Sequence, residues 1–397
     1  MALGTRESRS IADRVGERGP LTVAAFMDLA LYDPELGYYA RAPRRSGRAG
    51  DFFTSVDVGP LFGELLEIQL AEMQQLLART SDFVLRTFDL VEAGAGNGRL
   101  SADILRAAKG RDPAFYDSIH LHLVEASPEA RRGQSAALGE VAERLHTSGD
   151  TLPESFEGVL VANELLDAFP VHQVVMREDG LREVYVRASN VARPCQGRVG
   201  DPERVALRLE EGPPSTPALG AYLDRLGVTL EPGWRVEINL RAVDWIREAA
   251  RRLRRGFIIL IDYGHEAAEL YSATHSAGTL TSYAAHQSAG PESSAPVPGW
   301  LQQPGDRDIT SHVDFTSVRN AAEAEGLTTI ALLDQTYLLL GLLNGAGARS
   351  FDEVKDRLAL KTLLMPGGLG STHKVMIFGK GVGAPALAGC SFRVRIT

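Results

Sequence analysis

The sequence predicts an α/β protein with a mostly parallel sheet, preceded by a helical N-terminal region and interrupted by a β-hairpin insertion. From Thr87 onward, short apolar segments alternate with segments of helical period. Such alternation is typical of a parallel sheet covered on both faces. Before that point the apolar spacing is that of helices. Residues 170–217 instead contain β-like runs joined through Asp179-Gly180, a pair typical of a hairpin turn.

The predicted elements divide the chain into three regions. Residues 1–85 form the helical region, whose basic, glycine-bearing stretch predicts a lid before the core. Residues 86–380 form the core, with the insertion at about 170–217 and a Ser-, Gly- and Pro-rich active-site loop at about 272–313. Residues 381–397 form a C-terminal tail.

Within the core, apolar runs and amphipathic runs follow one another in the order of βαβ units. Helices are expected at 99–109 and 127–138. The runs that predict strands of the core sheet are 88–93, 119–126, 157–163, 234–240, 256–264, 327–334 and 373–380.

Composition argues against several classes of protein. The 397 residues carry a formal net charge of −9, which argues against a nucleic-acid-binding protein with a broad basic surface. The two cysteines, Cys195 and Cys390, lack metal-site spacing, so we expect no metal site and a reducing compartment. No apolar run reaches about 18 residues and no secretory h-region opens the chain. With the excess of arginine over lysine, these features predict a cytoplasmic bacterial protein without membrane association.

The clearest ligand-binding signal is a glycine turn at the end of the first core strand. Gly94, Gly96 and Gly98 form a G-x-G-x-G pattern, which lets a ligand approach the backbone and the N–H groups of the next helix. A dinucleotide fingerprint would need glycine where Arg99 stands, and no Gly-Lys-Ser/Thr closes the turn as in a phosphate-binding loop. NAD and ATP therefore both fit poorly.

Two acidic residues flank this turn. Glu92 precedes it and can attract the cationic amino or sulfonium end of S-adenosyl-L-methionine, whereas it would repel a pyrophosphate. Glu125 ends the next strand, where a carboxylate can accept hydrogen bonds from both ribose hydroxyls. Its separation from the glycines exceeds the roughly 20 residues of dinucleotide folds, which an extended intervening helix would explain. These residues predict S-adenosyl-L-methionine as the cofactor.

A second polar group follows the apolar run Val159–Ala162. If that strand lies beside the glycine-turn strand, Asn163 can orient a substrate amine at the cofactor's methyl group. Glu164 and Asp167, three apart on a short helix, would then point to one side. The same residues also fit an ordinary helix start, with Asn163 as N-cap and acids in the first turn.

Several motifs occur here in a fixed order: "GDFFTS", "LFGE", "EAGAGNGRL", "ANELLDAFPV", "IDYG", "GTL", "DITSHVDF" and "LMPGGLG". Together they resemble the MidA family of class I methyltransferases, over about residues 21–380. The resemblance implies a Rossmann-like, seven-stranded methyltransferase sheet with S-adenosyl-L-methionine as methyl donor. It adds Thr54 and Ser55, which would help close the site, and it places Asn163 in the family's "NELLDA" motif among the cofactor-binding positions.

The resemblance also implies a kind of acceptor. The family's mitochondrial relative methylates arginine on a subunit of the respiratory NADH dehydrogenase, so a protein side chain is the expected acceptor. A guanidinium stays protonated and needs carboxylates that orient it, a role that suits Glu164 and Asp167, with Asp308 or Asp314 as helpers. The expected partner is a protein substrate, such as a respiratory-complex subunit, and a homodimer fits as well.

Two other functions stay open from the sequence. The first is O- or N-methylation of a small molecule in specialised metabolism, and a hydroxyl acceptor would need a base such as His286 or His312. The second is an assembly chaperone that binds S-adenosyl-L-methionine without turnover. Thr281 stands where the family often has arginine, and the segment 285–300 is rich in Ser, Ala and Pro. Both departures concern the acceptor more than the cofactor.

Overall fold

The computed structural model describes residues 10–41, 54–79, 87–190, 205–284, 287–291, 297–345, 353–365 and 369–392. Its contacts divide the chain into two compact units. The first unit comprises Met1–Ala42, Ala168–Arg241 and Ala267–Ser311, and the second comprises Pro43–Asp167, Ala242–Glu266 and His312–Thr397.

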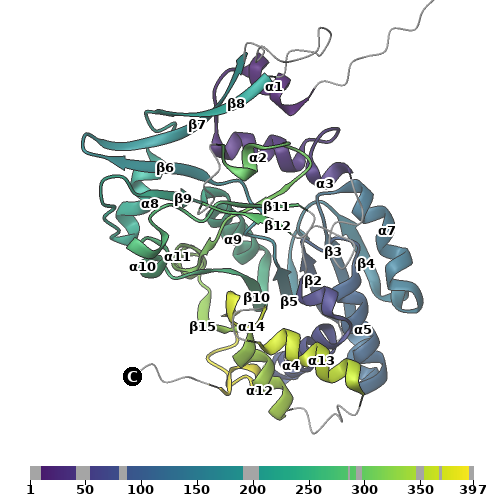
Figure 1. The fold of residues 1–397 in the computed structure, drawn as a ribbon. Coiled ribbons are helices and arrows are strands. Elements are labelled where there is room, and N and C mark those ends of the chain that lie inside the picture. The colour runs from purple at the N-terminus through teal and green to yellow at the C-terminus, as the bar shows by residue number, and fades with distance from the viewer. Residues whose placement is uncertain are drawn as a thin grey trace, which may run out of the picture. The chain divides into compact units, whose positions relative to one another are not determined.

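The second unit is built on an eight-stranded sheet, which confirms the predicted α/β fold (Figure 1). Seven of its strands form one continuous path, and the two-residue strand β14 (Val313–Asp314) pairs with β10 (Leu253–His265) beside that path. That path has the order β4 (Leu145–Gly149), β3 (Ile119–Val124), β2 (Phe88–Ala93), β5 (Phe156–Asn163), β10, β16 (His373–Lys380) and β15 (Thr328–Asp334). The strands from β4 to β10 are parallel, whereas β16 is antiparallel to both of its neighbours. Six of the strands on this path were predicted from the sequence, whereas β4 was not.

Helices cover this sheet because its strands are apolar on both faces. Leu90 and Ile259, which share one face, join a core with the long helices α4, α5 and α12. Leu160 and Ile258 on the other face are also buried, and α11 contacts β10. The helices of this unit are η1 (Ser55–Val58), α4 (Leu61–Arg79), α5 (Arg99–Arg111), α6 (Pro113–Ser118), α7 (Pro128–Leu138), η2 (Gly139–Arg144), most of α9 (Leu240–Arg252), α11 (Phe315–Ala324), α12 (Gln335–Gly345), α13 (Val354–Leu364), α14 (Leu369–Thr372) and η5 (Ala388–Cys390).

The short helix α6 explains the long separation between the glycine turn and Glu125. Asp112 ends α5 and caps α6, where its carboxylate accepts a hydrogen bond from the Phe115 N–H at 3.0 Å. Pro113 occupies the first helical position, where its missing N–H costs nothing. The extension expected between the two strands is therefore a separate capped helix.

The first unit contains a five-stranded antiparallel sheet. Its strands are β1 (Leu21–Thr22), β7 (Gly180–Asn190), β6 (His172–Arg177), β9 (Arg235–Ile238) and β8 (Val205–Gly212), which pairs with β7. The predicted hairpin is confirmed, since Arg177 pairs with Gly180 across its turn. The strand predicted at 234–240 is present as β9, but its assignment to the core sheet is wrong because it pairs with β6. Its apolar alternation predicts a strand, whereas the partner is decided by contacts distant in sequence.

Two other expectations differ from the structure. The predicted loop at 272–313 contains the small antiparallel sheet of β12 (Gln287–Ala289), β11 (Thr281–Ala284) and β13 (Asp308–Thr310). Residues 1–85 are divided, because the described part up to Arg41 belongs to the first unit and α4 to the second. The first unit's helices are α1 (Ile11–Arg18), α2 (Val23–Tyr32), α3 (Tyr38–Arg41), α8 (Ala218–Leu226), α10 (Ala267–Leu270), η3 (Ala273–His275) and η4 (Gly299–Leu301).

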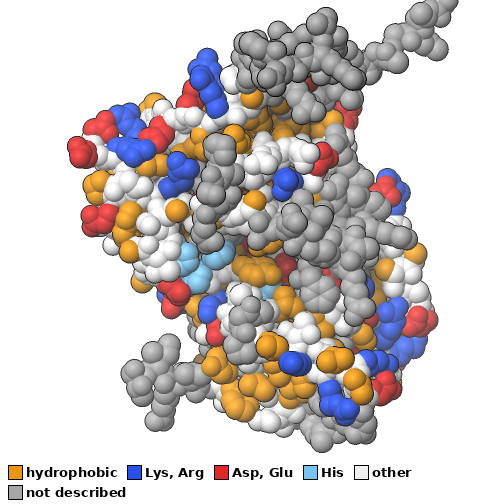
Figure 2. Space-filling view, in the orientation of Figure 1, with side chains coloured by type: hydrophobic (Ala, Val, Ile, Leu, Met, Phe, Trp, Pro, Cys, Tyr) orange, Lys and Arg blue, Asp and Glu red, His pale blue; other side chains and the backbone are white. Residues whose placement is uncertain are grey.

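Several predictions concern surfaces and terminal segments. None of the helices in the described ranges is long and apolar enough to span a membrane. Basic and acidic side chains are interspersed over the face in Figure 2, with no broad basic surface among its described residues.

The tail packs on α4, where the Gly389 N–H donates to Gln69 Oε1 at 3.0 Å. Cys195 and most of the predicted lid stretch at 41–55 lie outside the described residues.

A buried glutamate on α4 predicts a pH-dependent stability. Glu67 is fully buried, and burial raises the pKa of its carboxyl to about 7 although Arg111 lies 3.1 Å away. Because the pKa of Glu67 is raised in the folded protein, this group's contribution to the free energy of unfolding is fully present below pH 4.5. That contribution is lost as the pH rises through 7. We therefore expect Glu67→Gln to raise the free energy of unfolding by about 2 kcal/mol at pH 8 and far less at pH 4.5. Urea unfolding at both pH values checks this, with the exposed Glu154→Gln as control; an equal effect at both values would contradict it.

Candidate active site

The candidate site lies in the second unit, at the carboxyl ends of the three adjacent strands β2, β5 and β10. Ala93 of β2 pairs with Ala162 of β5, and Asn163 of β5 pairs with Ile261 of β10. The prediction that the glycine-turn strand lies beside the strand of Asn163 is therefore confirmed. Ligands of open parallel sheets bind at this edge, near the point where the strand order reverses.

The glycine turn leaves open space above its central glycine, Gly96. Gly94, Gly96 and Gly98 have φ values of 73°, 51° and 80°, which side chains with a Cβ rarely adopt. A Cβ on Gly94 would lie 3.0 Å from the Leu165 side chain, whereas one on Gly96 would meet no described atom within 4 Å. The first glycine therefore serves packing, and Gly96 leaves space where a ligand can approach the backbone.

Glu92 has a structural task that differs from its predicted one. The side chain is buried, and its Oε2 accepts hydrogen bonds from the backbone N–H of Ser101, at 3.2 Å, and from the Ser101 hydroxyl. Burial raises the pKa of the Glu92 carboxyl to about 7. The carboxyl group therefore ties the end of β2 to the first turn of α5, and its direct attraction of the cofactor stays a prediction.

Glu125 lies directly against the glycine turn. Its Oε2 accepts a hydrogen bond from the Gly96 N–H at 2.8 Å, and its Oε1 accepts one from the Ser127 N–H at 2.7 Å. A carboxylate has about four acceptor positions, so these two bonds leave capacity for a ligand's hydroxyl groups. The side chain is half-buried and orders the turn as well as offering acceptors.

The segment after Asn163 is an irregular turn, so the predicted short helix is wrong. Its backbone N–H groups bind a side chain: those of residues 165–167 donate to Asp262 Oδ2 at 3.1, 2.8 and 3.4 Å. Glu164 has a φ of 50° and donates its N–H to the Ile261 carbonyl at 2.8 Å. A non-glycine residue at positive φ costs of order 1 kcal/mol and is typical of functional sites. With no helix here, Asn163 is not an N-cap.

Asp262, like His373, is a site residue that the sequence did not identify. It is 1% exposed, and the Tyr263 N–H donates to its Oδ1 at 2.8 Å. Burial raises the pKa of the Asp262 carboxyl to about 7, against the backbone donors that favour its charged form. The available signal was the carboxylate itself, which follows the apolar run 257–261 in the motif "IDYG".

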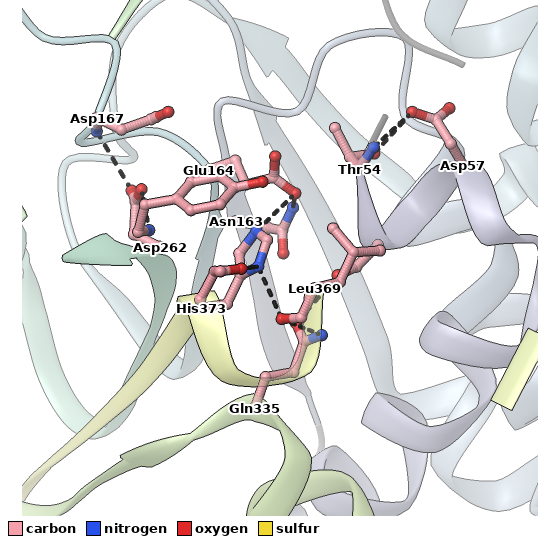
Figure 3. A network of polar contacts seen from close by, with 12 residues as sticks. Thr54, Asp57, Asn163, Glu164, Asp167, Asp262, Gln335, Leu369 and His373 are labelled. Atoms are coloured by element: carbon pink, nitrogen blue, oxygen red, sulfur yellow. Dashed lines mark hydrogen bonds and ion pairs between the residues drawn. The ribbon is translucent and has the colours of Figure 1, made fainter. Parts of the chain in front are cut away.

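The Glu164 carboxylate lies against Asn163 and His373 (Figure 3). Its Oε1 accepts a hydrogen bond from Asn163 Nδ2 at 3.3 Å and lies 3.5 Å from His373 Nε2. Asn163 Oδ1 is buried and accepts no hydrogen bond from any described residue. A buried acceptor without a donor is costly in a native protein. This atom and Glu164 Oε2 are therefore candidate oxygen acceptors for a ligand at the end of β5.

Thr54 and Ser55 order the segment beside the glycine turn. The N–H and hydroxyl of Thr54 donate to Asp57 Oδ2 at 3.0 and 2.9 Å, and Asp57 forms an ion pair with Arg99 at 2.5 Å. Ser55 is fully buried and donates its hydroxyl to Gln335 Oε1 at 3.0 Å. Both side chains thus make contacts within the protein, and their role in closing the site stays a prediction.

The remaining predicted residues are distributed over both units. His286 lies outside the described residues. His312 precedes β14, with its ring centroid 5.2 Å from that of His265. Asp314 caps α11, where it accepts from the N–H groups of two residues and from a hydroxyl, and its role as a helper stays a prediction. Asp308 belongs to the first unit and accepts a hydrogen bond from a tyrosine hydroxyl.

Curated relatives of this chain are named as enzymes of one kind. A protein of Danio rerio named "Protein arginine methyltransferase NDUFAF7, mitochondrial" is 28% identical over 355 residues, which is 83% of this chain and 75% of the relative. The Homo sapiens protein of the same name is 27% identical over 83% of this chain and 72% of its own length. The Drosophila melanogaster homologue is 27% identical over 80% of this chain and 70% of its own.

Two solved structures share the fold of this chain. A crystal structure of a Burkholderia thailandensis protein bound to S-adenosyl-homocysteine matches with a TM-score of 0.80 and 25% identity, over 98% of both chains. A native crystal structure from the same organism matches with a TM-score of 0.77 over the same share. The sequence profile of a family of S-adenosyl-L-methionine-dependent methyltransferases matches residues 65–333. This chain belongs to that family of S-adenosyl-L-methionine-dependent methyltransferases.

Proposed function

We propose that this methyltransferase transfers the methyl group of S-adenosyl-L-methionine to an arginine side chain of a partner protein. The observation that carries the proposal is Glu164, a carboxylate at the edge of the cofactor-binding sheet with one oxygen held by Asn163 and His373. The curated relatives from fish, fly and human are named protein arginine methyltransferases, which supports the same acceptor.

The glycine turn fits the cofactor. The open space at Gly96 lets an adenosyl group approach the backbone, and Glu125 has acceptor capacity for ribose hydroxyls. When bound, S-adenosyl-L-methionine supplies a methyl group on a sulfonium, which makes that carbon electrophilic. The protein's own task is to hold the acceptor in line and to exclude water.

The acceptor side of the site suits a guanidinium group. A guanidinium keeps its proton, because its pKa lies above about 12, and it presents several N–H donors in one plane. Glu164 Oε2 and Asn163 Oδ1 are two oxygen acceptors at the end of one strand. A carboxylate that binds one edge of the guanidinium localises its charge and orients the opposite nitrogen toward the methyl group.

Incubation with radiolabelled S-adenosyl-L-methionine and a cell lysate tests the acceptor. We expect label in a protein band, released as methylarginine on acid hydrolysis. A respiratory-complex subunit is the partner that we propose, so its band is examined first. Label in an organic extract would instead support a small-molecule acceptor, and measurable cofactor binding without transfer would support a chaperone.

A further inference from the structure

We propose that His373 is a positioning residue, whose imidazolium holds the Glu164 carboxylate in the orientation that the acceptor needs. The inference rests on the proposed function for the identity of the acceptor. The pair itself is a feature of this chain, formed between the turn after β5 and the start of β16 (Figure 3).

The protonation state of His373 follows from its two neighbours. Its Nδ1 lies 2.9 Å from the Leu369 carbonyl oxygen, and a carbonyl only accepts hydrogen bonds, so Nδ1 carries a proton. In a neutral ring Nε2 would then present a lone pair to Glu164 Oε1, 3.5 Å away. Two facing acceptors would repel each other, which favours a proton on Nε2 and therefore the imidazolium form. At 3.5 Å the contact is an ion pair and is long for a hydrogen bond.

The surroundings keep His373 in place and keep water away. The ring is fully buried, and its centroid lies 3.9 Å from that of Tyr263. Burial lowers the pKa of His373, whereas the Glu164 carboxylate and the carboxyl group of Asp262 raise it. The second effect is the larger, so the pKa lies above the usual 6.5. The Leu369 carbonyl that fixes the ring also accepts from Gln335 at 3.3 Å. The imidazolium is thus built into the same network that orders the site.

The arrangement divides the Glu164 carboxylate between two tasks. Oε1 is occupied by His373 and Asn163, and Oε2 is left for the guanidinium. Loss of the His373 proton would turn attraction into repulsion at Oε1, and the carboxylate would leave its position. We therefore expect kcat to fall at alkaline pH, with an apparent pKa above 6.5.

Nuclear magnetic resonance of the protein with ¹⁵N-labelled histidine tests the pair without any acceptor. We expect both ring nitrogens of His373 to carry protons at pH 6, and the pKa of His373 to fall in Glu164→Gln. The His373→Gln variant assigns the resonance. Identical titration curves in the wild type and in Glu164→Gln, or an unprotonated Nδ1, would overturn the proposal even if arginine methylation is confirmed.

Kinetics with an arginine substrate test the consequence for the reaction. His373→Gln keeps an uncharged donor near Nε2, so we expect a smaller fall in kcat than in His373→Leu and no alkaline decline. His373→Leu removes the donor, and we expect kcat to fall about 10- to 100-fold with an unchanged KM for S-adenosyl-L-methionine. The exposed His146→Gln is the matched control. A wild-type pH profile in His373→Leu would overturn the positioning role, whereas absence of arginine methylation in the wild type would overturn only the proposed function.

Discussion

Replacement of Gly96 by valine is expected to weaken binding of S-adenosyl-L-methionine by at least about 100-fold, equivalent to about 2.7 kcal/mol. The added side chain would fill the open space above the turn, where a Cβ meets no described atom within 4 Å. It would thereby block the approach of the cofactor to the backbone. Isothermal titration calorimetry with S-adenosylhomocysteine measures the loss.

The matched control for this variant is Gly227→Val. Gly227 ends α8 with a φ of 63°, close to the 51° of Gly96, and also has open space above it. Both variants therefore carry a similar backbone strain, but only one lies in the candidate site. Equal loss of affinity in the two variants would show that strain is the cause. Undiminished affinity in Gly96→Val would show that the cofactor binds elsewhere.

Replacement of Glu164 by glutamine is expected to lower kcat for arginine methylation by about 100- to 10,000-fold. The amide keeps the size of the side chain but loses the charge that orients the guanidinium and pairs with His373. Affinity for S-adenosylhomocysteine should stay within about threefold, because the glycine turn and Glu125 are unchanged. Single-turnover kinetics and calorimetry separate the two effects.

Glu154→Gln serves as the control for Glu164→Gln. Glu154 is exposed, between β4 and β5 of the same unit, and should leave both kcat and affinity unchanged. If Glu164→Gln keeps full arginine methylation, the carboxylate does not orient the acceptor. A parallel loss of cofactor affinity would assign Glu164 to the cofactor instead.

The fold was predictable from the sequence because local patterns determine its elements. One supersecondary unit of about 25 residues contains the apolar strand Phe88–Ala93, the glycines after it and the following amphipathic helix. Glu125 was found by its place at the end of the next strand. Each of these signals depends on neighbours in sequence, whereas the parallel pairing of β2 with β5 joins strands that are not consecutive in the chain.

The polar network could not be predicted in the same way because its bonds join distant segments. The turn after Asn163 lacks a helix because Asp262, about 95 residues away, binds its N–H groups. His373 meets Glu164 only through the antiparallel β16, more than 200 residues further along the chain. Local propensity favoured a helix at 164–167, and tertiary hydrogen bonds overrode it. The partner of β9 was missed for the same reason.

A crystal structure with S-adenosylhomocysteine and an arginine-containing substrate peptide tests the central claim most directly. We expect the cofactor product at the Gly96 turn with its ribose hydroxyls on Glu125, and the peptide guanidinium within hydrogen-bonding distance of Glu164. A guanidinium bound away from Glu164, or a cofactor product bound away from the glycine turn, would contradict this assignment of the site.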